Sequence, residues 1–162
     1  MSQGQGPAID SFDRRILEIC QISNRTTNDR IAETVGLSPA AVQRRLKRLR
    51  AENIIRADVS LVDPKAVGKG MTFVVQVALE RERLDLMHSF KKEMLSNPAV
   101  QQCYYVTGSC DFILVMTAAD MEEYDKFTQA AFFNNPNIKN FHTHVVMDAV
   151  KVGLSVPIDI ER

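Results

Sequence analysis

A pattern of strand, helix, turn and strand occurs twice in the C-terminal part of the chain, and this repeat limits the fold more than any other feature. The dipeptide Asn97-Pro98 recurs 38 residues later as Asn135-Pro136, and the same shift carries Val75 onto Ile113. A repeated βαβ unit predicts the ferredoxin-like arrangement βαββαβ. The expected halves are Met71–Thr107 and Cys110–Val150, joined by a hairpin at Gly108-Ser109.

Each half contains one amphipathic segment that predicts a helix, over residues 83–95 and 121–133. Both helices of this topology cover the same face of the sheet. The other face also carries apolar residues, namely Val74, Ala78, Ile113 and Val115. An uncovered apolar face predicts a homodimer formed sheet to sheet. The residues expected to face the core are Leu84, Met87, Phe90 and Met94 in the first helix and Met121, Tyr124, Phe127, Ala131 and Phe132 in the second.

The first third of the chain predicts three short helices whose boundaries carry capping residues. Asp10 and Thr27 precede the first two helical patterns as N-caps. Gly36 supplies the left-handed residue that ends the second helix. Ser38 and Pro39 then begin a third helix as its N-cap and first helical residue. Two helices joined by a tight glycine turn are typical of a helix-turn-helix.

The third helix concentrates positive charge that the whole-chain total conceals. The chain has 20 Lys and Arg residues against 20 Asp and Glu residues. Five cations nevertheless occur between Gln43 and Arg50 without an acidic residue. In a helix-turn-helix this favours binding to double-stranded promoter DNA over a solvated basic helix on an unrelated domain. We expect Gln43, Arg44 and Lys47 at base edges, Ala40 at a point of close approach, and Ser38, Arg25 and Arg48 at phosphates.

The segment after the third helix predicts a short β-wing. Asn53 can adopt a left-handed backbone, and partly alternating residues follow it as far as Pro64. The fold class is therefore α+β. The expected domains are a winged helix-turn-helix at 9–63, a linker at 64–70, the ferredoxin-like domain at 71–153 and a C-terminal tail at 154–162.

Cysteine usage and hydropathy favour a cytoplasmic protein. The three cysteines form no Cys-x-x-Cys motif, which indicates a reducing compartment. The longest apolar run, Phe112 to Met116, is too short to cross a membrane. The first residues lack the pattern of a secretory signal.

The chain resembles the Lrp/AsnC (leucine-responsive, feast/famine) family of transcription regulators from Ile9 to about Gly153. The resemblance rests on Ile31-Ala32-x-x-Val35-Gly36-Leu37-Ser38-Pro39, on Val106-Thr107-Gly108-Ser109-Cys110-Asp111-Phe112 and on Thr143-His144-Val145-Val146-Met147. It implies a bacterial or archaeal DNA-binding regulator that dimerises through its C-terminal domain and assembles further, to an octamer. It implies no cofactor, but a small-molecule effector, an amino acid, bound between dimers. The effector-binding residues it implies are Gly108, Asp111, Met121, Phe133, His144, Val145 and Val146.

Two positions depart from the family pattern. The family usually has Gly-Asp-Tyr/Phe-Asp where this chain has Gly108-Ser109-Cys110-Asp111, and it often has Tyr near the position of His144. Some siroheme decarboxylases resemble the same family, so an enzyme using His142 and His144 is an alternative function. The two histidines could also form a metal pair, although no third ligand occurs at a known spacing.

Three further alternatives remain at the level of sequence. Asp111 could cap the hairpin rather than bind an effector. Cys103 and Cys110 could form a redox switch, although ordinary strand cysteines are the commoner case. The chain could also be a metabolite-binding module that regulates another protein, and the basic helix argues against that.

Overall fold

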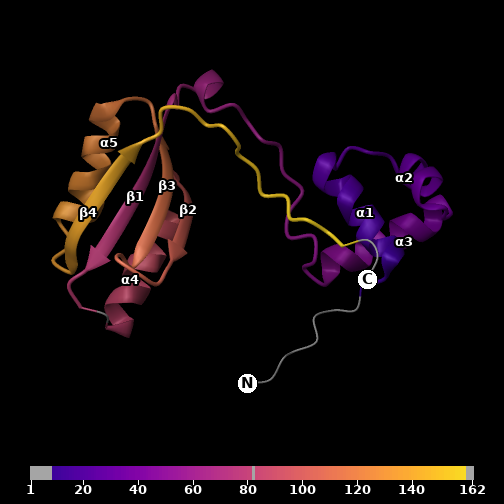
Figure 1. Ribbon diagram of the computed structural model, residues 1–162, viewed down its shortest axis with the longest axis horizontal. Helices are drawn as coiled ribbons and strands as arrows, with labels where there is room; N and C mark the ends of the chain where they lie inside the picture. Colours follow the sequence, from indigo (N-terminus) through magenta and orange to yellow (C-terminus); the bar gives the residue numbers. More distant parts are fainter. Residues whose placement is uncertain (1–8, 82, 160–162) are drawn as a thin grey trace. The chain divides into compact units, whose positions relative to one another are not determined.

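The computed structural model describes residues 9–81 and 83–159. The chain divides into two compact units. The first, which we call the head, runs to Ser60 and also contains the segment that begins at Lys151. The second, the C-terminal unit, is Leu61–Val150. Figure 1 shows that the head consists of helices and that the C-terminal unit contains the sheet.

Three helices form the head, and their ends carry the predicted caps. They are α1 (Ser11–Ile22), α2 (Asn28–Val35) and α3 (Pro39–Ala51). Asp10 and Asp13 form a capping box at the start of α1. Thr27 and Ser38 cap α2 and α3 through their side-chain oxygens, and Gly36 ends α2 with φ at 76°. The predicted helix-turn-helix is confirmed.

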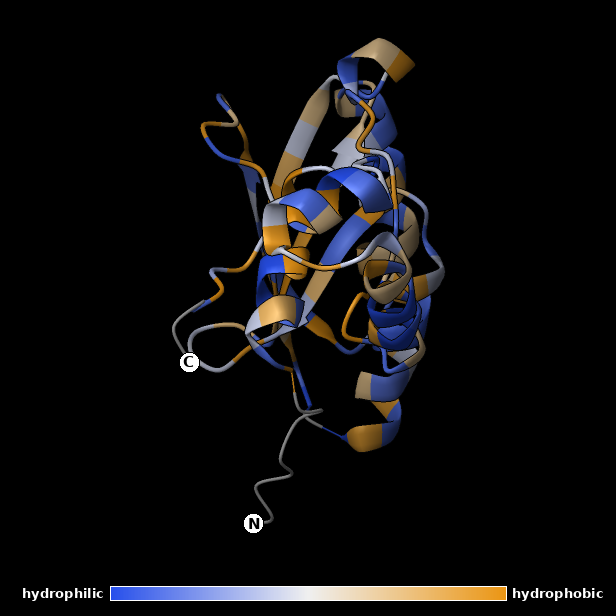
Figure 2. Cartoon of the chain, turned by 90° about the vertical axis from the view of Figure 1, so that its right-hand side faces the viewer, coloured by the Kyte–Doolittle hydropathy of each residue, from blue (hydrophilic) through white to orange (hydrophobic). Residues whose placement is uncertain are grey.

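The apolar sides of the three helices meet in a small core. Ile16 of α1, Ile31 of α2 and Leu49 of α3 are at most 1% exposed. Ala32 is also buried, and its small side chain permits close packing of α2 on α3. Hydrophobic and hydrophilic stretches alternate along the helices in Figure 2, as amphipathic helices around a core require.

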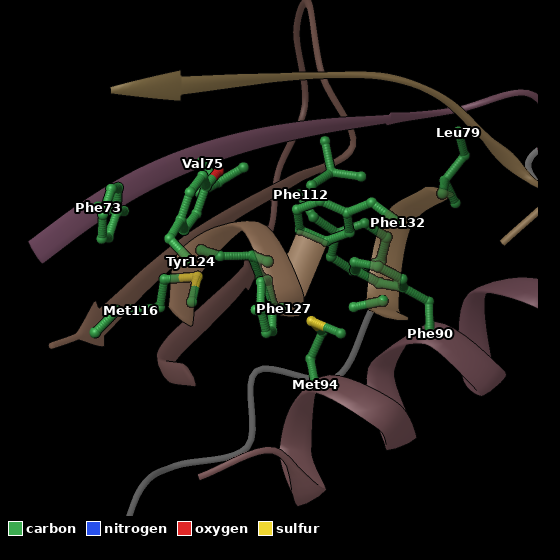
Figure 3. Packing of buried hydrophobic residues seen from close by; sticks show 14 of the residues in the cluster. Phe73, Val75, Leu79, Phe90, Met94, Phe112, Met116, Tyr124, Phe127 and Phe132 are labelled. Carbon is green, nitrogen blue, oxygen red and sulfur yellow. The ribbon is translucent and has the colours of Figure 1, made fainter. Parts of the chain in front are cut away.

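The C-terminal unit is an antiparallel sheet with its helices packed on one face (Figures 1 and 3). Its strands lie in the order β2-β3-β1-β4. This arrangement confirms the predicted ferredoxin-like fold, βαββαβ. The elements are β1 (Met71–Leu79), α4 (Leu84–Ser96), β2 (Val100–Tyr105), β3 (Phe112–Ala118), α5 (Met121–Thr128), a π-helical extension η2 (Gln129–Phe133) and β4 (Ile138–Val145).

Large side chains fill the space between the sheet and its helices (Figure 3). Phe73 and Phe112 point from the central strands into this core and are 0% exposed. Phe73 stacks on Tyr124 of α5 with ring centroids 4.1 Å apart, and Phe112 contacts Phe90 of α4 at 4.7 Å. Aromatic contacts of this kind fix both helices on the same face of the sheet.

Two residues expected in this core lie at the surface instead. Leu84 and Met121 are 74% and 51% exposed. Each is the first residue of its helix, α4 or α5. Helical side chains point back toward the N-terminus, so a first residue projects beyond the surface that its helix covers. Phe133, at the end of the π-helical turn, is also 69% exposed.

The sheet face away from the helices is less apolar than predicted. Val74 and Val115 lie half-buried at its centre. Polar side chains occupy the same face on the two outer strands. Tyr104 of β2 lies opposite Ile113 of β3, and His144 of β4 lies opposite Val74 of β1. The prediction considered only the two central strands. The uncovered face is therefore an apolar centre with polar edges.

One prediction about the connecting segments is wrong. Residues 54–63, expected to include a β-wing, contain no strand. A strand needs a neighbour for its backbone groups, and the described chain supplies none there. The segment from Lys151, which includes the predicted C-terminal tail, belongs to the same unit as the head. Within the expected linker, Lys65–Val67 forms a single 3₁₀ turn, η1.

Candidate functional site

The exposed side of α3 carries the residues predicted to contact base edges. Spacings of three and four residues place these side chains on one face of the helix. Ser38, at the start of α3, and Arg25, between α1 and α2, are also exposed. The exposed residues of α3 in this set are Ala40, Gln43, Arg44 and Lys47.

A buried carboxylate holds two of the five cations of α3 against α1. Asp13 is 0% exposed and accepts from Arg45 at 2.8 Å, from Arg48 and from the backbone N–H of Asp10. Arg45 also donates to Asp10 at 2.7 Å and lies over the Phe12 ring. We call this group the Asp13 clamp. Because both arginines reach from α3 to α1, the clamp fixes the orientation of α3 within the head.

The clamp shifts the ionisation of its outer members. Burial alone would raise the pKa of Asp10, but hydrogen bonds from the Asp13 backbone and from Arg45 hold it below its ordinary value. The hydrogen bonds to Asp10 and Asp13 raise the pKa of Arg45 in turn. Arg48, which was expected to contact a phosphate, has one guanidinium nitrogen paired with Asp13, and its side chain is 41% exposed.

A third cation of α3 is held outside the clamp. The Arg50 guanidinium donates to both carboxylate oxygens of Asp58, at 2.7 and 3.2 Å. This hydrogen bonding lowers the pKa of Asp58. Among the described residues, Arg44 and Lys47 are then the two cations between Gln43 and Arg50 without an ion-pair partner.

The chemistry of this exposed row suits base recognition. Arg and Lys can donate to the O6 and N7 atoms of guanine, and Gln can pair with the N6 and N7 atoms of adenine. An α-helix fits the major groove of B-DNA, and a small residue such as Ala40 permits close approach. Sequence reasoning found this row. It missed Asp13 as the partner of Arg45 and Arg48, and Asp58 as the partner of Arg50. The two acids of the pattern Asp10-x-x-Asp13, in a chain with a basic third helix, could have indicated such ion pairs.

The predicted effector residues fall into two groups at opposite ends of the sheet. Asp111 lies beside the end of β1, because its side chain accepts from the Leu79 N–H at 2.7 Å. At the other end, the Val146 N–H donates to the Thr72 carbonyl. Thr72 and Leu79 are seven residue steps apart on β1, which separates Val146 from Asp111 by about 23 Å at ~3.3 Å per residue. Gly108, Asp111 and Phe133 belong to the first group, and Met121, His144, Val145 and Val146 to the second.

Asp111 has a structural contact of its own. Besides the bond from Leu79, its backbone N–H donates to the Val77 carbonyl, and its carbonyl accepts from the Val106 N–H. The bond from Val106 closes the β2–β3 hairpin, where Gly108 has φ at 127°, and the other two join Asp111 to β1. One carboxylate oxygen of Asp111 therefore bonds the end of β1 and not the backbone of the hairpin that it was expected to cap.

His142 and His144 share the uncovered face of the sheet. Each lies opposite a residue of β1, Gln76 and Val74 respectively. No group of three or more His, Cys, Asp or Glu side chains in the described ranges is placed to hold a metal. Cys20, Cys103 and Cys110 are free thiols, and burial raises the pKa of Cys20 and Cys103.

A shallow cavity of about 410 Å³ opens between η2 and the start of β4. Phe132, Phe133 and Phe141 line it together with Lys139. Phe133 is the one effector residue implied by the resemblance that reaches this cavity. In the described part of the chain, no helix combines the length and apolar character needed to span a membrane.

Comparison with known proteins identifies both units. The profile of the Lrp/AsnC ligand binding domain matches residues 72–156, and that of the AsnC-type helix-turn-helix domain matches residues 9–50. The chain is 52% identical over 152 residues to the uncharacterized HTH-type transcriptional regulator y4tD of Sinorhizobium fredii, covering 94% of this chain and 90% of that one. It is 35% identical to the transcriptional regulator AzlB of Bacillus subtilis, covering 95% and 98%.

Solved structures share the fold. The transcriptional regulator NMB0573 of Neisseria meningitidis, in its complex with L-Met, superposes with a TM-score of 0.86 at 28% identity and covers 93% of this chain and 97% of that one. An AsnC family transcriptional regulator from Agrobacterium tumefaciens superposes with a TM-score of 0.85 at 26% identity, covering 92% and 97%.

Proposed function

Because the chain belongs to the Lrp/AsnC family of transcriptional regulators, we propose that α3 reads promoter DNA and that the C-terminal unit binds an amino-acid effector between subunits. The observation that carries the DNA part is the distribution of ion pairs on α3. Arg45, Arg48 and Arg50 are occupied within the head. Arg44 and Lys47, the residues expected at base edges, are exposed.

Two copies of the head are needed to read a palindromic site. Dimeric helix-turn-helix proteins contact half-sites about 34–36 Å apart. The uncovered sheet face, with Val74 and Val115 at its centre, is the surface on which we propose that two copies pair. Its polar edges match the usual anatomy of an interface, in which a polar rim surrounds an apolar core. Further assembly, to an octamer, is the extension that the family resemblance implies.

The separation of the two effector groups supports a site made by more than one copy. A free amino acid is far shorter than the distance of about 23 Å between their outermost members, Asp111 and Val146. A site that contains Asp111 from one group and Met121 from the other therefore needs two chains. Met121 and Phe133 are both more than half exposed, as residues completed by a neighbouring copy would be. The neighbour complexed with L-Met supports an amino acid as the ligand class.

The enzyme alternative is less well supported. The named relatives are transcriptional regulators, and the two histidines lie on the face proposed to form the dimer. We propose that the protein acts as a regulator in the cytoplasm, where its DNA target is found. A coloured, haem-like absorbance of the purified protein would favour the siroheme decarboxylase alternative instead.

Selection of genomic fragments tests the DNA part. Purified wild-type protein should retain a defined set of fragments, and Arg44→Ala with Lys47→Ala should retain none while unfolding at the wild-type temperature. The control variant Arg81→Ala with Lys92→Ala removes the same charge from exposed positions of the C-terminal unit, and it should retain the wild-type set. Equal retention by both double variants would overturn the assignment of α3.

A thermal-shift screen with the free amino acids tests the effector part. A ligand at 100 times its Kd adds about 2.7 kcal/mol to the free energy of unfolding. The stabilisation should be lost in Asp111→Asn, which keeps an acceptor for the Leu79 N–H, and in Met121→Ala. Because each site would combine one residue from each of two copies, mixed oligomers of the two variants should regain roughly a quarter of the sites. No recovery on mixing would place the site within one chain.

A further inference from the structure

The C-terminal segment of the described chain is docked on α1. We call Lys151–Asp159 the strap; it is the yellow segment that reaches the head in Figure 1. The side chain of Gln21 donates to the Val156 carbonyl at 3.0 Å and accepts from the Val156 N–H at 2.7 Å. Two helical turns earlier on α1, Arg14 donates to the Asp159 carbonyl at 3.3 Å.

One side chain anchors the strap to the head. Ile158 is partly buried and packs against the head core. The other large apolar residues of the strap, Val152, Leu154 and Val156, are 79%, 77% and 63% exposed. Because an amide can donate and accept at once, Gln21 pairs with the Val156 backbone as a neighbouring strand would. The docking therefore depends on the backbone at Val156 and on the side chain at Ile158.

The strap gives the head a second covalent route to the C-terminal unit. The first route leaves the head at Ser60, and the second leaves the C-terminal unit at Val150. A head held by a single linker would sample the whole volume within reach of that linker. A second attachment reduces this volume and raises the effective concentration of the head at any one position.

We propose that the docked strap restricts where the head can lie and thereby fixes the separation of two heads on DNA. The proposal rests on the DNA-binding function proposed above. None of the strap's hydrogen bonds in the described part of the chain involves Ser38, Gln43, Arg44 or Lys47. Each head can therefore bind its own half-site whether the strap is docked or released. Docking acts on the spacing between half-sites.

Hydrogen exchange measured by mass spectrometry on the full-length protein tests the docking without DNA. The amide of Val156 should be protected in the wild type and exposed in Gln21→Ala and in Ile158→Ala. Two matched variants should keep the protection. Glu18→Ala changes an exposed residue of the same helix, and Val156→Ala shortens an exposed side chain but keeps the backbone bonds. Rapid exchange in the wild type, or equal protection in all five proteins, would overturn the docking.

Binding to paired half-sites tests the consequence. The DNA carries two copies of a half-site selected with the wild-type protein, and the separation between the two copies is varied in steps across one helical turn of about 10 base pairs. The wild type should lose at least about tenfold in affinity when the separation changes by half a turn, since this turns one half-site to the opposite side of the duplex. Gln21→Ala and Ile158→Ala should bind a single half-site as the wild type does and show a flat dependence on spacing.

The outcomes separate this inference from the proposed function. If the released variants kept the wild-type dependence on spacing, the strap would not control the heads, although DNA binding would stand. If the wild type bound no DNA, the proposed function and the control of spacing would both fail. Protection at Val156 would in that case still show that the strap is docked.

Discussion

Arg44 and Arg45 are neighbours on α3, yet the structure predicts opposite consequences for replacing them with alanine. Arg44 is exposed and has no ion-pair partner in the described residues. Arg45 belongs to the Asp13 clamp. We expect Arg44→Ala to weaken DNA binding without loss of stability. We expect Arg45→Ala to destabilise the head.

The size of the Arg45 effect follows from what the guanidinium contacts. It donates to Asp13, which is 0% exposed, and to Asp10, and it covers the ring of Phe12. Removing one partner of a buried ion pair costs about 3–5 kcal/mol. Asp13 keeps Arg48 and one backbone donor, so we expect a loss of about 2–3 kcal/mol, in the range of a hydrogen bond to a charged group. For a small domain this lowers Tm by roughly 10–20 °C.

Thermal unfolding followed by circular dichroism measures both variants. Arg44→Ala should change the free energy of unfolding by no more than about 0.5 kcal/mol, as exposed substitutions usually do. The Arg45→Ala loss should shrink in acid. The folded-state pKa of Asp10 lies below its ordinary value, so its stabilising contribution is present above about pH 4 and is lost as the pH falls through the lower value. Equal Tm values for the two variants would refute the clamp.

Three other outcomes follow from single contacts. In an NMR titration the pKa of Asp58 should lie below its ordinary value, and Arg50→Ala should return that pKa to the ordinary range. The contribution of Asp58 to stability is therefore lost as the pH falls through the lowered pKa. Phe90→Ala should lower the stability of the C-terminal unit by about 3–5 kcal/mol in denaturant unfolding, because the ring is 1% exposed between α4 and the sheet. Asp111→Ala should speed exchange of the Leu79 amide, whereas Asp111→Asn should leave it protected because an acceptor remains.

Most of the fold could be predicted because its signals are local. Asp10, Thr27, Gly36 and Ser38 specify helix ends through bonds within a few residues, and all four act as predicted. Asn53 likewise adopts the expected left-handed backbone, with φ at 57°. The 38-residue repeat predicted the sheet topology because each βαβ half repeats the same alternation of strand and helix.

The candidate site was harder to predict because its decisive contacts are distant in sequence. Arg48 points outward on an ideal helical wheel, but its long side chain reaches Asp13, 35 residues away. The strap pairs Gln21 with Val156 across 135 residues. A wheel or an alternation pattern describes one element at a time and contains no information on such pairs.

The central claim is that exposed Arg44 and Lys47 read base edges, and discrimination between bases tests it most directly. Affinities of wild type, Arg44→Ala and Lys47→Ala are measured on a selected half-site and on each of its single-base variants at one salt concentration. For the wild type, a wrong base at a contacted position should cost about 1–3 kcal/mol. Each alanine variant should lose discrimination at one position and keep it elsewhere. Variants that weaken binding equally on every sequence, or not at all, would contradict the account.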